Sequence, residues 1–169
     1  LSEAFLYYNA REMDKTGDVS TTTDIGSRVR PAIESLGKYG LAQEEFCRYN
    51  EDDYTTKPSE EAYEDASKRR LLKALNVDMS TQGIKAALAE GYPVAVSLAL
   101  CESFLKASND GYVPMPTAEE IERRFTTSPE EQERHSSHAM VVVGYSDKLG
   151  RFIVRNSWDT DWGDAGYCY

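Results

Sequence analysis

The chain has 169 residues, 40% of them hydrophobic, which is enough for one domain with a core of its own. A formal net charge of −10 at pH 7 disfavours nonspecific binding to nucleic acids and to anionic membranes. No apolar run reaches the length of a transmembrane helix, and residues 1–12 lack the charged and apolar regions of a signal peptide. We therefore expect neither a nucleic-acid partner nor a membrane partner, and these features assign no compartment.

The three cysteines are Cys47, Cys101 and Cys168. Their spacing matches no metal-binding motif, and an odd number allows at most one internal disulfide. We expect no metal and no cofactor.

Residues 1–70 have the apolar spacing of helices. Ser2 is a candidate N-cap for the first helix, and Ser27 for a second helix that carries Pro31 near its first turn and ends at Gly40. A third helical pattern opens after Ser59. The sequence thus predicts a helical N-terminal part.

Residues 71–169 are predicted to form a second, β-rich part. Leu71–Leu75 is a candidate short strand leading into it. A helix capped by Ser80 or Asp78 follows, and alternation of large and small residues over 94–100 then predicts a half-buried strand.

The segment from Tyr112 to Ser137 is polar and charged. Thr117 and Glu120 have the spacing of a capping box, which predicts a short helix. We expect a solvated surface loop around it; a loop that gates substrate is the alternative, because the segment runs directly into His138.

The C-terminal tail carries the strongest functional signal. Two apolar runs, 139–143 and 152–154, flank a glycine-containing turn, as in a pair of adjacent strands. Pairing of these strands can bring His138 and Asn156 to one end of the sheet, with Trp158 beside them. A histidine base, an amide that orients it and an indole that excludes water are the groups that catalysis by a thiol requires.

This tail resembles the papain-like cysteine peptidases. Their histidine segment reads His-Ala-Val-x-x-Val-Gly-Tyr, and their asparagine segment reads Asn-Ser-Trp-Gly-x-x-Trp-Gly-x-x-Gly-Tyr. The second pattern is matched by Asn156, Ser157, Trp158, Trp162, Gly163, Gly166 and Tyr167. Asp159 departs from it, since the family usually has glycine there; aspartate tolerates a left-handed backbone better than most residues, so we expect the turn to survive.

The resemblance implies an α+β fold in which a helical lobe faces a β-rich lobe across the catalytic cleft. It implies that His138 is the general base and that Asn156 orients it, with Trp158 and Trp162 as supporting residues. Ser137 and Ala139 match positions that line the substrate site in relatives. The implied substrate is a peptide or protein, and a secreted or other extracytoplasmic location would be in keeping with the family.

The segments LSEAFLYYNAR and KYGLAQEEFCRYN resemble the helical lobe of bacterial-type members. In the family they follow the helix that bears the nucleophilic cysteine. Asn9 stands where many secreted relatives have a disulfide cysteine, so that disulfide is not expected.

No segment of this chain resembles the nucleophile motif, so we expect the cysteine and the oxyanion glutamine upstream of Leu1. None of Cys47, Cys101 and Cys168 opens an apolar helix after a glycine-rich turn, where a thiol's pKa would be lowered. This chain alone is therefore predicted to be inactive. Its partners would be a substrate and its own propeptide or N-terminal segment.

Two alternatives to a peptidase remain at this stage. One is a catalytically inactive papain-fold protein that binds other molecules, which would have no need of the full set of His138, Asn156, Trp158 and Trp162. The other is a thiol acyltransferase with related Cys–His chemistry, which would not explain the Asn-Ser-Trp pattern.

Overall fold

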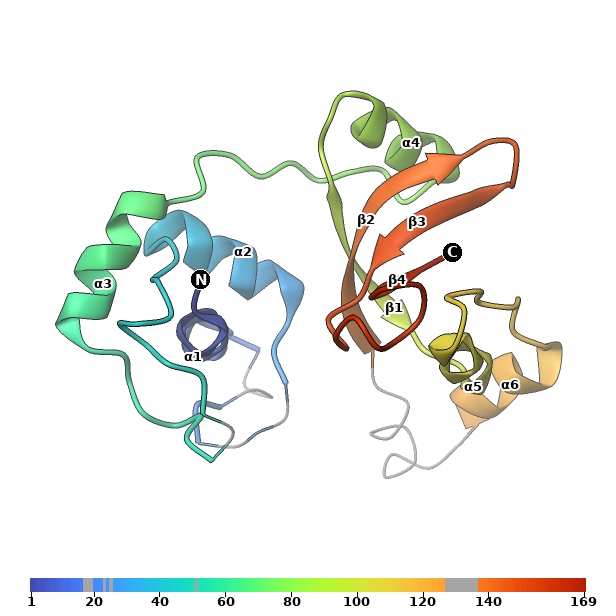
Figure 1. Cartoon of the computed structure of the whole chain (residues 1–169). Helices are drawn as coiled ribbons and strands as arrows, with labels where there is room; N and C mark the ends of the chain where they lie inside the picture. Colours follow the sequence, from blue (N-terminus) through green and yellow to red (C-terminus); the bar gives the residue numbers. More distant parts are fainter. Residues whose placement is uncertain (17–19, 23, 25, 51, 127–136) are drawn as a thin grey trace. The chain divides into compact units, whose positions relative to one another are not determined.

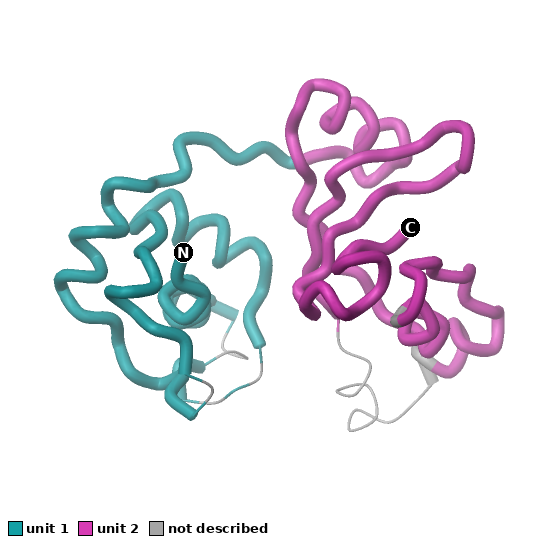
Figure 2. Tube along the Cα trace, in the orientation of Figure 1, with its two compact units in different colours: residues 1–76 teal, residues 77–169 magenta. Residues whose placement is uncertain are grey.

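The computed structural model describes residues 1–16, 20–22, 24, 26–50, 52–126 and 137–169. The chain divides into two compact units, Leu1–Asn76 and Val77–Tyr169 (Figure 2). The sequence pattern places this boundary after residue 70, whereas the structure divides after Asn76. Among the described residues, no helix combines the length and the hydropathy needed to cross a lipid bilayer.

The first unit is built from short helices joined by irregular segments (Figure 1). Its elements are α1 (Glu3–Met13), α2 (Val29–Lys38), α3 (Glu60–Ala66) and the 3-10 turn η1 (Ser67–Arg69). Helices α1 and α2 pack against each other. The predicted helical character of the N-terminal part is confirmed.

Helix α1 begins where the sequence predicts. The hydroxyl of Ser2 accepts a hydrogen bond from the Phe5 amide at 3.0 Å, and it donates to the carbonyl of Cys47 at 2.5 Å. A capping hydroxyl of this kind satisfies one of the free N–H groups of the first turn. Here it also ties the helix start to a segment distant in the sequence.

Aromatic and small residues form the core of this unit, together with one buried amide. Phe5 packs on Ala62 and Ala66, and its ring meets Tyr63 edge-on at a centroid distance of 5.1 Å. Asn9 is fully buried and accepts a hydrogen bond from the Tyr63 hydroxyl at 2.8 Å. At the position where the family resemblance suggests a disulfide cysteine, this chain thus has a satisfied hydrogen bond between α1 and α3.

The predicted cap of α2 is wrong. The helix starts at Val29 with Arg28 as N-cap, and no side chain caps it. Pro31 lies in the first turn and has no N–H. Because Pro31 is the third residue of the helix, one of the first-turn donors that a capping side chain would satisfy is absent.

The expected strand at Leu71–Leu75 is also wrong. The Leu71 amide donates to the Leu36 carbonyl at 3.0 Å, but Leu72 is 98% exposed and the segment has no regular secondary structure. A strand needs a neighbouring strand to satisfy its backbone groups, and the described residues offer none here.

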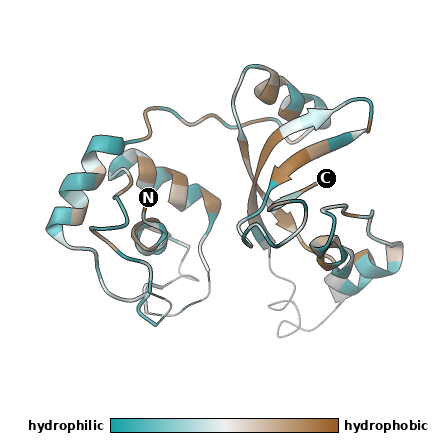
Figure 3. Cartoon of the chain, in the orientation of Figure 1, coloured by the Kyte–Doolittle hydropathy of each residue, from teal (hydrophilic) through white to brown (hydrophobic). Residues whose placement is uncertain are grey.

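The second unit contains a four-stranded antiparallel sheet in the order β1-β2-β3-β4. Its elements are α4 (Thr81–Ala89), β1 (Val94–Ala99), α5 (Glu102–Leu105), η2 (Lys106–Ser108), α6 (Ala118–Thr126), β2 (Ser137–Ser146), β3 (Arg151–Arg155) and β4 (Tyr167–Cys168). Figure 3 shows hydrophobic residues along the strands of this sheet. Helix α4 packs on β1 and β2 and is capped by Ser80, one of its two predicted caps.

The register of the sheet brings the predicted site together. Val141 pairs with Arg155, and an irregularity between Val142 and Gly144 shifts the pairing of the rest of β2 with β3. On its other edge β2 pairs with β1, where His138 lies opposite Leu98. As a result, the start of β2 and the residue after β3 lie at one end of the sheet.

The predicted strand over 94–100 is shorter than expected, because Cys101 serves as the N-cap of α5.

The capping box of α6 is confirmed. Thr117 and Glu120 exchange backbone-to-side-chain hydrogen bonds, and the Glu120 carboxylate also accepts from the Ser103 amide at 2.9 Å. That carboxylate therefore joins α6 to the start of α5. Residues 127–136 of the predicted surface loop lie outside the described residues.

Replacing Gly40 should strongly destabilise the first unit. Gly40 has φ = +87°, and a Cβ there would lie 2.0 Å from the Ala66 carbonyl oxygen. Gly26 has a similar φ of +84° with nothing within 4 Å, which makes it a matched control. We expect Gly26→Ala to cost about 1–2 kcal/mol from backbone strain alone. Gly40→Ala should cost a further ~1–3 kcal/mol or prevent folding. Equal urea midpoints for the two variants would contradict this.

Replacing Ala165 with glycine should stabilise the second unit. Ala165 has φ = 51° and an exposed side chain, so the left-handed backbone is strained and no packing would be lost. We expect Ala165→Gly to raise the free energy of unfolding by about 0.5–1 kcal/mol. Asp159, with φ = 66°, is the control, because its carboxylate accepts from the Thr160 amide at 2.6 Å. Asp159→Gly loses that bond and should be nearly neutral. A destabilised Ala165→Gly variant in urea unfolding would refute the strain argument.

Candidate active site

The predicted contact between His138 and Asn156 is present. The Nε2 atom of His138 lies 2.7 Å from Oδ1 of Asn156, which also accepts from the Ser157 amide at 2.8 Å. An amide oxygen can only accept, so Nε2 carries the proton and donates. Asn156 is 8% exposed, and burial of this kind strengthens the bond.

The indole of Trp158 lies against the imidazole, as predicted. The centroids of the His138 and Trp158 rings are 4.7 Å apart, with 31° between their planes. Trp158 also meets Trp162 edge-on at 5.3 Å. The two indoles thus form a continuous apolar wall beside the hydrogen bond.

No sequence pattern predicts the residue that supports these two indoles. Phe104 on α5 is 6% exposed, stacks on Trp162 at 5.4 Å and meets Trp158 edge-on at 5.6 Å. Helix α5 spans only four residues, which is too short for a periodic pattern to reveal. The only available signal was the apolar pair Phe104 and Leu105 between polar neighbours.

The turn after Asn156 fixes its backbone. The Asn156 amide donates to the Gly166 carbonyl at 2.9 Å, and the Gly166 amide donates to the Trp162 carbonyl at 2.8 Å. Asp159 adopts the left-handed conformation expected of it, with φ = 66°. The departure from glycine at this position therefore leaves the turn intact.

The other ring nitrogen of His138 is available for chemistry. In the part of the chain that the structure describes, Nδ1 of His138 makes no hydrogen bond. With the proton held on Nε2, Nδ1 has the lone pair of a neutral imidazole. The arrangement can therefore accept a proton at Nδ1 while Asn156 keeps the ring in place.

Ser137 and Ala139, the candidate substrate-binding residues, flank His138 on β2. Both are exposed, and they pair with Ala99 and Ser97 of β1. These small side chains leave the surface beside the base open. The other histidine, His135, lies outside the described residues.

The three cysteines are free, and none is a partner of His138 among the described residues. Burial raises the pKa of the Cys168 thiol and is also the main cause of the raised pKa of Cys47. Both thiols are therefore almost entirely protonated at neutral pH, and only the thiolate is a good nucleophile. Cys101 is half-buried at the start of α5.

No group of three or more histidine, cysteine, aspartate and glutamate side chains within the described ranges could hold a metal ion.

The model of the papain family of cysteine proteases matches residues 21–169. A peptidase C1-like protein of Acanthamoeba polyphaga mimivirus, itself uncharacterized, is 31% identical over 98% of this chain and 51% of its own length. Short matches include "Peptidase 1" of Dermatophagoides pteronyssinus, 62% identical over 34 residues.

Among solved structures, xylellain, a cysteine protease from Xylella fastidiosa, superposes with a TM-score of 0.81 and 25% identity, over 99% of this chain and 62% of that one. A procathepsin L of Tenebrio molitor has a TM-score of 0.67 and 20% identity. The chain thus spans about half the length of the viral relative and under two thirds of xylellain. The expected α+β papain-like fold is confirmed, and the chain belongs to the papain family of cysteine proteases.

Proposed function

We propose that the whole protein hydrolyses peptide bonds through a Cys–His–Asn site to which this chain contributes His138 and Asn156. The observation that carries the proposal is the 2.7 Å hydrogen bond between Nε2 of His138 and Oδ1 of Asn156, covered by the Trp158 ring. A binding module would have no use for a base held in one tautomer. The family membership supports a hydrolase.

The mechanism follows from the free Nδ1 atom. The thiol of a cysteine outside these 169 residues would transfer its proton to Nδ1 of His138, giving a thiolate and an imidazolium. The thiolate would attack the peptide carbonyl, and the imidazolium would return the proton to the leaving amine. Water would then hydrolyse the acyl-enzyme, with His138 again acting as base.

Asn156 would act as a positioning residue in this scheme. It accepts from Nε2 both in the neutral ring protonated at Nε2 and in the imidazolium, so it stabilises both the orientation and the imidazolium. Trp158 would exclude water from the bond, and the Phe104–Trp162 stack would hold Trp158 in place. Ser137 and Ala139 would lie beside the bound peptide, which enters next to the base.

The test is the kinetics of the whole protein on a fluorogenic peptide. We expect His138→Ala to lower kcat/KM by about 10²–10⁴-fold, because the general base is lost. Asn156→Ala should cost about tenfold, the equivalent of one hydrogen bond. Asn109→Ala, an exposed amide in the same unit, is the control. Thermal melting would verify that all variants fold. Unchanged turnover in folded His138→Ala would exclude the proposal.

The thiols of this chain should behave as ordinary cysteines. We expect iodoacetamide at pH 7 to label Cys47 and Cys168 slowly, because their raised pKa values leave little thiolate at that pH. Peptide mapping should give the same rates for Cys47, Cys101 and Cys168 in the wild-type chain and in its His138→Ala variant. Rapid labelling of any of them that disappears with His138 would place the nucleophile inside this chain instead.

A further inference from the structure

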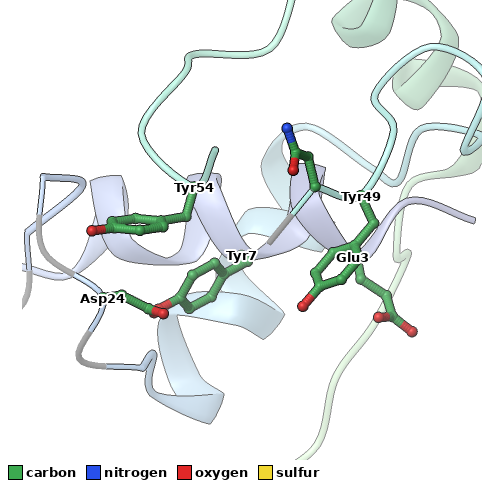
Figure 4. A pocket seen from close by; sticks show the side chains of 6 residues that line it. Glu3, Tyr7, Asp24, Tyr49 and Tyr54 are labelled. Atoms are coloured by element: carbon green, nitrogen blue, oxygen red, sulfur yellow. The ribbon is translucent and has the colours of Figure 1, made fainter. Parts of the chain in front are cut away.

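The surface of the first unit carries a cavity with a distinct chemical character. Its volume is about 340 Å³, within the range of small-ligand pockets, which is roughly 300–1,000 Å³. It is lined by Glu3, Tyr7, Asp24, Tyr49, Asn50 and Tyr54 (Figure 4). Three phenol rings and two carboxylates thus meet around one space.

Helix α1 contributes two of the residues that line this cavity. Glu3 and Tyr7 are one helical turn apart, so they lie on the same face of α1. Figure 4 shows the Tyr7 ring with Tyr54 to one side and Tyr49 beside Glu3 to the other. All three rings therefore lie where a group in the cavity can contact them.

Hydrogen bonds fix the Tyr7 ring. Its hydroxyl donates to the Asp24 carboxylate and accepts from the Gly26 amide at 3.1 Å. Burial, followed by the hydrogen bond to Asp24, raises the pKa of Tyr7, so the phenol stays neutral. Asp24 then provides negative charge at the ring edge.

The guanidinium of Arg11 already lies over the rings of Tyr7 and Tyr54. Arg11, one turn beyond Tyr7, has its guanidinium carbon 4.0 Å from the Tyr7 centroid and 5.4 Å from that of Tyr54. It is 1% exposed and donates to the carbonyls of Ser20 and Thr21. This contact shows that the two rings accept a planar cation in this fold.

The two carboxylates of the cavity carry negative charge that no ion pair of the described residues offsets. None of the ion pairs found within the described residues involves Glu3 or Asp24. Even with the Arg11 cation on the Tyr7 and Tyr54 rings, an anion would meet two carboxylates, and a neutral apolar group would leave a net negative charge uncompensated. A cation would gain both the charge attraction and the π faces.

We propose that this cavity binds a small organic cation, an alkylammonium or guanidinium group, between the rings of Tyr7, Tyr49 and Tyr54 with Glu3 and Asp24 as counter-charges. The group can come from a free amine or from a lysine or arginine side chain of a polypeptide. The site lies wholly within the first unit and does not depend on the proposed peptidase chemistry.

The experiment is an NMR titration of the 169-residue chain carrying ¹³C-labelled tyrosine rings. The probes are cadaverine for a free amine, N-acetyl-lysine amide and N-acetyl-arginine amide for side chains, and N-acetyl-norleucine amide as the uncharged control. We expect the charged probes to shift the signals of Tyr7, Tyr49 and Tyr54, and the shifts to weaken with added salt. Whichever charged probe binds more tightly identifies the source.

Matched variants test the assignment. Tyr49→Leu removes a π face at a position that is 58% exposed, and Tyr92→Leu does so at an equally exposed position in the other unit. Glu3→Gln removes a carboxylate from the first turn of α1, and Glu60→Gln removes one from the first turn of α3. We expect Tyr49→Leu and Glu3→Gln each to weaken binding about three- to tenfold, and the two controls to leave it unchanged.

Three results would overturn the proposal. The charged probes could leave all three rings unshifted, or the norleucine probe could shift them as strongly, which would indicate a merely apolar pocket. Binding of equal strength in Tyr49→Leu, Glu3→Gln and the wild-type chain would place the cation elsewhere.

Discussion

The geometry of the candidate site depends on the antiparallel pairing of β2 with β3. Val141 of β2 lies opposite Arg155 of β3. This register places His138, near the start of β2, close to Asn156, which follows β3. A slip of one residue would turn every side chain of a strand to the other face of the sheet. His138 and Asn156 would then no longer meet at 2.7 Å. The apolar side chains of Met140 and Val142, buried at 4% exposure, hold the register because a slip would expose them.

Phe104 connects the core of the second unit to the two indoles beside His138. Phe104 packs with Met140 and Cys168 in the core of the second unit and also touches both indoles. The position of Phe104 is in turn linked to α6, since Glu120 accepts from the Ser103 amide next to it. The imidazole of His138 therefore packs on Trp158, which packs on Phe104, which in turn packs in the core. This packing restricts the motion of the imidazole.

Buried polar side chains make up a larger part of the interior in the first unit than in the second. Its helices are short, and Asp65 of α3 ties that helix to an irregular segment by accepting from the Gln43 amide at 2.9 Å. It also pairs with Arg69 and Lys68 of the adjoining η1. The backbone hydrogen bond from Gln43, helped by the cationic neighbours, lowers the pKa of Asp65. The fully buried Asn9 serves the same purpose between α1 and α3. Such networks specify one arrangement where a small apolar core would allow several.

The sequence by itself determined what is local or carried by rare residues at fixed spacing. Ser2, Ser80 and the Thr117–Glu120 pair were recognised because a cap depends only on nearby backbone groups, and the histidine and asparagine segments were recognised by their pattern. The tertiary structure decided the rest. Leu71–Leu75 has strand-like residues but no strand beside it, and α5 is too short to show a period. Phe104 reaches the site only through packing. The tyrosine cavity brings α1 together with Tyr49, Asn50 and Tyr54, and contact across such a separation leaves no trace in local spacing.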